Sequence, residues 1–124
     1  MEKKNYVQHW IQQNHDGLAQ KSGFPISKLN EIHGSWFDKK NPVVLMDDSL
    51  KTKNFNQLIE WEEKVDVCLA IGTSLCGMRS DGVAASSAKK GGLVIINLQE
   101  TPYDNKACLR IYGNLQEVMK MLAK

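Results

Sequence analysis

Long hydrophobic segments and a one-sided charge are both missing from this sequence of 124 residues. The longest mainly apolar runs, Val65 to Ile71 and Leu93 to Leu98, are far shorter than the ~20 residues that span a bilayer, and they indicate buried strands instead. The 16 basic and 14 acidic residues are interleaved and give a net charge of +2, without a basic block that could follow a phosphate backbone. We therefore expect neither membrane nor nucleic acid as a partner.

Cysteine is scarce as well. The three cysteines, Cys68, Cys76 and Cys108, are an odd number at wide spacing, which favours a reducing compartment over a disulfide framework. The first residues, Met1 to Gln8, contain neither the apolar core nor the cleavage site of a secretory signal. The fractions of hydrophobic and charged residues, 42% and 24%, are ordinary for a globular protein. We expect one domain, residues 1–124, located inside the cell in the cytoplasm or nucleus.

Hydrophobic periodicity predicts an α/β fold. Strands are expected at 5–13, where a short amphipathic helix is the alternative, and at 29–33, 42–46, 65–71 and 93–98. Helices are expected at 16–21, from 52 up to the strand at 65, at 81–90 and at 114–122. Alternating strands and helices at this spacing favour a mostly parallel sheet with right-handed crossovers, in a Rossmann-like three-layer fold. The strands ending at Ile71 and Asn97 should then be parallel neighbours.

Polar residues follow these two strands where a parallel α/β sheet binds its ligands. Gly72 permits a close backbone approach, and the hydroxyls and amides of Thr73 and Ser74 suit a phosphate or a ribose. The side-chain amide of Asn97 can both donate to and accept from a sugar or a base. The alternative is that Gly72-Thr73-Ser74 is only a capping turn and that Asn97 is only a turn residue.

A second polar cluster, Gln13-Asn14-His15-Asp16-Gly17, comes just after an apolar segment. Gln13, Asn14 and Asp16 could orient a ribose or an amide, although an aspartate that caps a helix explains the same pattern. His33, followed by Gly34, could act as a general base near neutral pH. A purely structural histidine is the alternative.

The order of these clusters resembles the sirtuin family of NAD-dependent protein deacylases, from about Trp10 to the C-terminus. Trp10 to Leu18 is similar to the family's Val-Ile-Thr-Gln-Asn-Ile-Asp-Gly-Leu, and Glu31 to Ser35 is similar to its Glu-Leu-His-Gly-Ser. Ala70 to Leu75 contains its Gly-Thr-Ser-Leu. Three further segments match in weakened form or in spacing: Pro42 to Leu50, Val94 to Asn97, and Ile111 to Gly113.

The resemblance implies a role for each matching residue. His33 would be the general base, and Asn14 and Asp16, together with Gln13, would hold the nicotinamide ribose and the nicotinamide amide. The phosphates and adenosine of NAD would be held by Gly72, Thr73, Ser74 and Asn97, with Leu115 near the adenine. NAD would be consumed as a co-substrate together with an acylated-lysine protein or peptide. The products would be free lysine, nicotinamide and O-acyl-ADP-ribose.

The sequence also departs from the family. Only eight residues separate His33 from Pro42, and none is cysteine, so the family's zinc module is missing and we expect no zinc. His15 replaces the family's isoleucine beside the nicotinamide, and Cys76 to Arg79 lacks its Val-x-Pro. The family's Gly-Ala-Gly-x-Ser and Pro-Asp-Phe-Arg segments are also absent. We therefore expect weak NAD binding and only background nicotinamide release from these 124 residues alone.

Two other functions stay open at this point. One is a degenerate, non-catalytic sirtuin-like protein that binds ADP-ribose, NAD or a protein partner, although the presence of His33 together with Asn14 and Asp16 in the sequence favours catalysis. The other is a different Rossmann-like enzyme such as a nucleotide-using transferase. The absence of Gly-x-Gly-x-x-G after any predicted strand argues against an ordinary dehydrogenase.

Overall fold

The computed structural model describes residues 4–124, and the first three residues, on which the expectation about targeting partly depends, lie outside it. The chain divides into two compact units, unit 1 up to Glu60 and unit 2 from Trp61 onward. The single domain expected from the sequence stays a prediction. None of the helices in the described residues is both long and apolar enough to cross a membrane.

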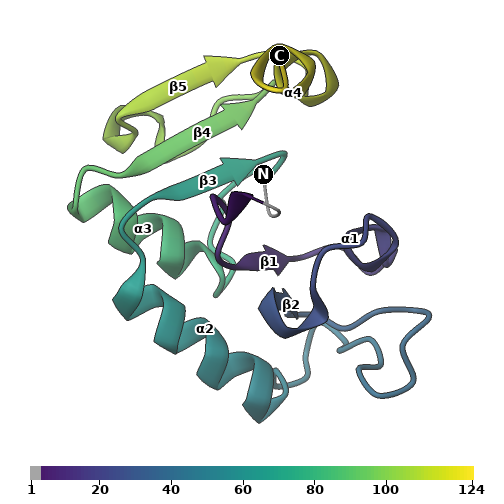
Figure 1. Ribbon diagram of the computed structural model, residues 1–124. Helices are drawn as coiled ribbons and strands as arrows, with labels where there is room; N and C mark the ends of the chain where they lie inside the picture. The colour runs from purple at the N-terminus through teal and green to yellow at the C-terminus, as the bar shows by residue number, and fades with distance from the viewer. Residues whose placement is uncertain (1–3) are drawn as a thin grey trace. The chain divides into compact units, whose positions relative to one another are not determined.

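Unit 1 is built around a two-stranded parallel sheet (Figure 1). Strand β1 (Trp10–Gln12) lies beside β2 (Leu29–Glu31), with the first residues of the two strands opposite each other. Between them come α1 (Leu18–Lys21) and a 3-10 turn, η2 (Ile26–Lys28). The first two turns of α2 (Thr52–Lys64) also belong to this unit. Because the strands are parallel, the segments that follow them leave from the same edge of the sheet.

Two expectations for unit 1 need correction. The first strand is confirmed, but it covers three residues rather than 5–13, and the segment 42–46 is not a strand. Pro42 has no N–H to donate to a ladder. The segment and the residue before it instead make isolated contacts with the turn after β2: the amide of Ser35 donates to the carbonyl of Asn41 (2.8 Å), and the amide of Val44 donates to the carbonyl of His33 (2.9 Å).

Unit 2 is a three-stranded parallel sheet in the order β3-β4-β5. Its elements along the chain are β3 (Cys68–Ile71), α3 (Asp81–Lys89), β4 (Leu93–Asn97), η3 (Asp104–Lys106), β5 (Leu109–Tyr112) and α4 (Leu115–Leu122). The predicted parallel pairing of the strands ending at Ile71 and Asn97 is confirmed. At that edge the amide of Gly72 donates to the carbonyl of Ile96 (3.1 Å). Strand β5 was not predicted, because its four residues are only partly buried and give no apolar run.

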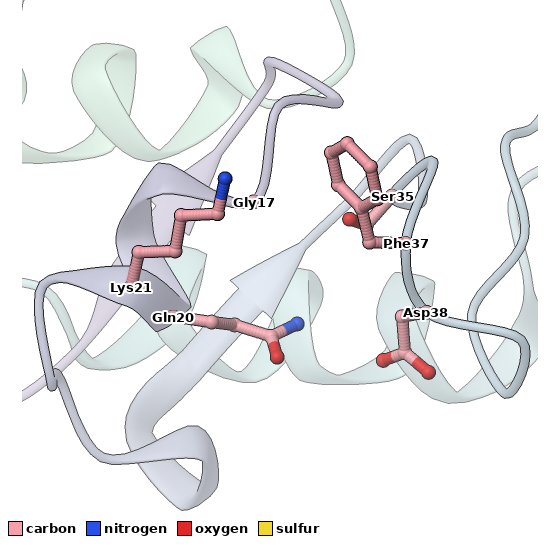
Figure 2. A pocket seen from close by; sticks show the side chains of 6 residues that line it. All are labelled: Gly17, Gln20, Lys21, Ser35, Phe37 and Asp38. Atoms are coloured by element: carbon pink, nitrogen blue, oxygen red, sulfur yellow. The ribbon is translucent and has the colours of Figure 1, made fainter.

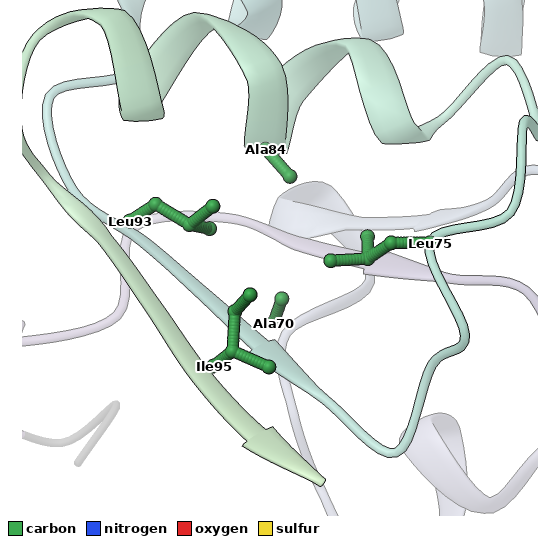
Figure 3. Packing of buried hydrophobic residues seen from close by; sticks show 5 residues of the cluster. All are labelled: Ala70, Leu75, Ala84, Leu93 and Ile95. Atoms are coloured by element: carbon green, nitrogen blue, oxygen red, sulfur yellow. The ribbon is translucent and has the colours of Figure 1, made fainter. Parts of the chain in front are cut away.

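The hydrophobic core of unit 2 lies where α3 packs against β3 and β4 (Figure 3). Its buried residues come from both strands, from α3 and from the loop after β3: Ala70, Leu75, Ala84, Leu93 and Ile95. Strand β3 is shorter than 65–71, and it is not buried on both faces as expected. Ala70 is 7% exposed whereas its neighbour Leu69 is 41% exposed, because successive side chains point to opposite faces of the sheet.

Candidate functional site

The polar cluster of unit 1 forms at the carboxyl edge of the parallel pair β1 and β2. Asn14 and Asp16 come shortly after β1, and His33 comes two residues after β2. The amide of Ile32 donates to the carbonyl of Gln12 (3.1 Å), which extends the pairing to the start of both loops. The structure therefore brings the predicted nicotinamide-side residues to one edge of one unit.

His33 has the properties of a proton acceptor. Its side chain is half-buried, and its Nε2 is buried without a hydrogen-bond partner in residues 4–124. Burial, and secondly the charge of the nearby His15, lower the pKa of His33 below its usual value. The imidazole is therefore neutral at physiological pH, and one of its nitrogens can accept a proton from a bound hydroxyl.

The predicted site residues after β1 differ in how far their side chains are available to a ligand. Asn14 is exposed, and Gln13 is half-buried. Asp16 Oδ1 accepts a hydrogen bond from the amide of Leu18 (3.0 Å), two positions further on, and Gly17 occupies the N-cap of α1, so this oxygen closes a turn before the helix. Asp16 can still offer its other carboxylate oxygen to a ligand, since the turn uses only one of the two.

A buried polar network that the sequence did not predict supports β2. Glu31 is only 5% exposed, and its Oε2 accepts from Gln20 Nε2 (2.6 Å). The main-chain carbonyl of Glu31 accepts from the side-chain amides of Asn41 (3.0 Å) and Asn54 (3.1 Å). These bonds hold the strand end that precedes His33. The residues are far apart in the sequence, and no local motif connects them.

A small pocket of unit 1 lies beside the polar cluster that follows β1 and β2, and the key residues of that cluster do not line it (Figure 2). Its volume is about 100 Å³, and its lining residues are Gly17, Gln20, Lys21, Ser35, Phe37 and Asp38. The Lys21 ammonium lies 5.1 Å from the centre of the Phe37 ring. Asn14, Asp16 and His33 do not line the pocket, so it is not the site predicted from the sequence.

In unit 2 the carboxyl ends of β3, β4 and β5 place the second set of predicted residues at one edge. Gly72 is exposed, with no atom within 4 Å of the position a Cβ would take, so a ligand can approach its backbone closely. Asn97 Nδ2 donates to the carbonyl of Thr73 (3.1 Å), which joins the end of β4 to the turn after β3. Ser74 is exposed in that turn, and Leu115 is half-buried in the first turn of α4, just after β5.

Arg110 on β5 holds the loop after β4, and sequence reasoning did not identify it. Its guanidinium donates to the carbonyl of Asn97 (3.0 Å) and pairs with Asp104 (2.7 Å). Burial by itself would raise the pKa of Asp104, but hydrogen bonds from Thr101, Tyr112 and Arg110 outweigh it and hold that pKa well below its usual range. Only the tertiary fold brings these groups together.

Metal ligands do not gather in the part of the chain that the structure describes: no three His, Cys, Asp or Glu side chains are grouped so that they could hold an ion. The expected absence of zinc stays a prediction. Burial raises the pKa of the Cys68 thiol to about 11, against a smaller lowering by a hydrogen bond with Ser87, which agrees with a core role for this residue.

The parallel sheet of unit 2, with a glycine turn and an asparagine at its carboxyl edge, defines an α/β protein with a Rossmann-like arrangement. No family model matches the chain. Among curated proteins it is similar to the NAD-dependent protein deacetylase SRT1 of Arabidopsis thaliana (30% identity, 96% of this chain, 33% of the relative). It is also similar to human sirtuin-7 (23% identity, 98% of this chain, 42% of the relative).

The same relationship appears in solved structures. A Sir2 structure in complex with the inhibitor EX-527, 2′-O-acetyl-ADP-ribose and a deacetylated p53 peptide superposes with a TM-score of 0.85 at 24% identity, covering 98% of this chain and 65% of that one. The chain belongs to the sirtuin family. It spans about a third to two-fifths of the length of the curated relatives given above. The alignment with SRT1 is 156 positions long, so the relative carries extra residues within the matched region.

Proposed function

We propose that this chain is part of a sirtuin-type NAD-dependent protein-lysine deacylase that acts inside the cell, in the cytoplasm or nucleus. The observation that carries the proposal is His33, a half-buried histidine with an unpartnered, buried Nε2 at the same sheet edge as Asn14 and Asp16. A module that only binds nucleotides has no need of such a base. The curated relatives named above are NAD-dependent protein deacetylases.

Each unit, taken by itself, offers groups that suit a different part of NAD. In unit 1, Asn14 and Asp16, with Gln13, offer amide and carboxylate groups to the nicotinamide ribose and the nicotinamide amide. In unit 2, the open backbone at Gly72 and the hydroxyls of Thr73 and Ser74 suit phosphates. Asn97 and Leu115 offer a polar and an apolar contact to the adenosine.

The chemistry divides between the co-substrate and the protein. When bound, NAD supplies a ribose carbon from which nicotinamide departs as the acyl oxygen of the lysine substrate attacks. His33 accepts a proton from a ribose hydroxyl, and its lowered pKa keeps it unprotonated for this task at neutral pH. Asn14 and Asp16 orient the ribose, so that the hydroxyl comes within reach of the His33 imidazole.

The proposed second substrate is an acylated lysine in a protein or peptide. Solved Sir2 structures with this fold hold a propionylated peptide and a myristoylated histone peptide, so the fold accommodates acyl groups of different length. The acyl group that this protein would remove is not part of the proposal.

A non-catalytic protein that binds ADP-ribose is the second candidate. It is supported by the residues of unit 2 that suit phosphates and adenosine, since these residues need no base. The bond of Asp16 Oδ1 to the amide of Leu18 supports it too, because this bond gives Asp16 a role in the turn before α1 without any ligand.

Ligand binding followed by NMR tests which residues hold which part of NAD. ADP added to the ¹⁵N-labelled chain should shift the amide signals of Gly72, Thr73, Ser74 and Asn97. NAD should additionally shift Asn14, Asp16 and His33, because NAD carries the nicotinamide ribose and the nicotinamide, which ADP lacks. Shifts confined to other residues, or none at millimolar ligand, would contradict the assignment of the NAD-binding residues.

Measuring turnover tests whether His33 acts as the general base. Because only background release is expected from the 124 residues alone, nicotinamide release from NAD is measured with an acetyl-lysine peptide on a protein in which the family's Gly-Ala-Gly-x-Ser and Pro-Asp-Phe-Arg segments precede this chain. In that extended protein His33→Ala should lose ~10²-fold or more while NAD binding changes much less. His9→Ala is the matched control: His9 precedes β1, at the opposite edge of the same sheet, and burial lowers its pKa to about 4. NAD binding without release by the extended wild-type protein would favour the second candidate, and equal loss in both variants would remove His33 as the base.

A further inference from the structure

His15 links the two loops that carry the proposed catalytic residues. Its imidazole Nδ1 lies 3.2 Å from the carbonyl oxygen of Gly34, the residue directly after His33. Its own carbonyl accepts from the amide of Trp36 (3.0 Å) and from the hydroxyl of Ser35 (3.4 Å). Three hydrogen bonds from one residue therefore join the loop after β1 to the loop after β2.

We infer that His15 is a positioning residue for His33, in place of the isoleucine that sirtuins carry beside the nicotinamide. A carbonyl oxygen can only accept, so the bond to Gly34 requires the proton on His15 Nδ1. An isoleucine cannot make this bond. The imidazole therefore fixes the peptide that follows the base, while its ring lies against Trp36 (centroids 5.9 Å apart) and next to His33 (6.4 Å).

His15 also acts on His33 by charge. After burial, His15 is the second cause that lowers the pKa of His33, because two positive imidazoles at this distance repel. Two nearby carboxylates in the sequence each use one oxygen in a hydrogen bond: Asp16 Oδ1 accepts from the amide of Leu18, and Glu31 Oε2 accepts from Gln20, while Glu31 Oε1 is buried without a hydrogen-bond partner in residues 4–124. Burial is the larger cause of the lowered His33 pKa, and His15 adds to it in favour of the neutral form that a proton acceptor needs.

The inference rests on the proposed function, since it assigns His15 to the same site, but it can be tested without turnover. Three variants separate position from charge. His15→Asn keeps a donor near the place of Nδ1 without a charge, His15→Gln moves the donor to the place of Nε2, and His15→Ile has neither donor nor charge. All three can be compared with the wild-type chain by NMR.

Position is measured by amide hydrogen exchange at Trp36 and Val44, whose amides bond to the carbonyls of His15 and His33. Loss of one hydrogen bond is worth about 1 kcal/mol, so His15→Ile and His15→Gln should exchange about fivefold faster there, whereas His15→Asn should match the wild type. Charge is measured by titrating the His33 ring signals, and the pKa of His33 should rise in all three variants. If residue 15 only filled space, the pKa of His33 would not change in these variants.

The results decide the inference in either direction. Unchanged exchange in both His15→Gln and His15→Ile, or an unchanged His33 titration in all three variants, would overturn it. If His15→Ile does not fold, the contrast between His15→Asn and His15→Gln gives the same decision. Absence of nicotinamide release by the extended wild-type protein would count against the deacylase proposal alone, because the exchange and titration data do not depend on catalysis.

Discussion

Replacing Gly34 by alanine should damage the candidate site more than any other glycine substitution of the same type in unit 1. Gly34 has φ +82°, and a Cβ at this position would collide with the backbone of Pro42 and Val43. Gly23 provides a matched control, because its φ is nearly the same, +80°, but its Cβ would meet nothing within 4 Å. Both substitutions introduce the same side chain at the same kind of backbone conformation.

The expected decreases in the free energy of unfolding follow from two separate energetic costs. A left-handed conformation costs an L-residue about 1–2 kcal/mol, and this cost is shared by Gly23→Ala and Gly34→Ala. Overpacking adds ~1–3 kcal/mol, and only Gly34→Ala bears it, because the obstacle is main chain that cannot rotate away. The free energy of unfolding should therefore fall by about 1–2 kcal/mol in Gly23→Ala and by ~2–5 kcal/mol in Gly34→Ala.

Urea unfolding provides the measurement, followed at the amide signal of Ile32, which reports on the pairing of β2 with β1. The extra cost of Gly34→Ala should appear together with faster exchange of the Val44 amide, since its bond to the carbonyl of His33 lies within the displaced segment. Equal destabilisation by the two variants would refute the reasoning, because it would show that the segment at Pro42 moves aside freely.

Three further predictions concern the core, the acid stability and the metal content. Ile95→Ala removes a fully buried side chain and should lower the free energy of unfolding by ~2–5 kcal/mol, whereas Leu98→Ala, at a position 67% exposed, should change it by about 0.5 kcal/mol or less; similar losses in both would contradict the described core. The folded-state pKa of Asp104 lies below its unfolded value, so the stability that its hydrogen bonds contribute is present above about pH 4 and is lost as the pH falls further. Melting temperatures over that range should decline less in Asp104→Asn than in the wild type, and parallel declines would refute this. Elemental analysis should find no stoichiometric zinc in the purified protein, and a chelator should leave the unfolding curve unchanged; one zinc per chain would overturn the prediction.

Local sequence patterns predicted β3, α3 and β4 of unit 2. The apolar run around Ile95 could only be a buried strand, and glycines after α3 mark the return of the chain to the sheet. The alternation of strands and helices then predicted the parallel order of β3 and β4, and with it the common edge of Gly72 and Asn97. The spacing between His33 and Asn14 gave no such information. Their common edge depends on the pairing of β1 with β2, which are three residues each.

The sequence by itself determined the α/β class, the helices α2, α3 and α4, and the residue types of the candidate site, because these follow from periodicity and from short motifs. Only the tertiary structure decided that 42–46 is not a strand, that Leu109–Tyr112 is one, and that Arg110 holds the carbonyl of Asn97. It alone showed that His15 bonds to the peptide after His33. Such contacts join residues 13 to 19 positions apart, and their formation depends on strand pairing and loop closure, which no local pattern of side chains encodes.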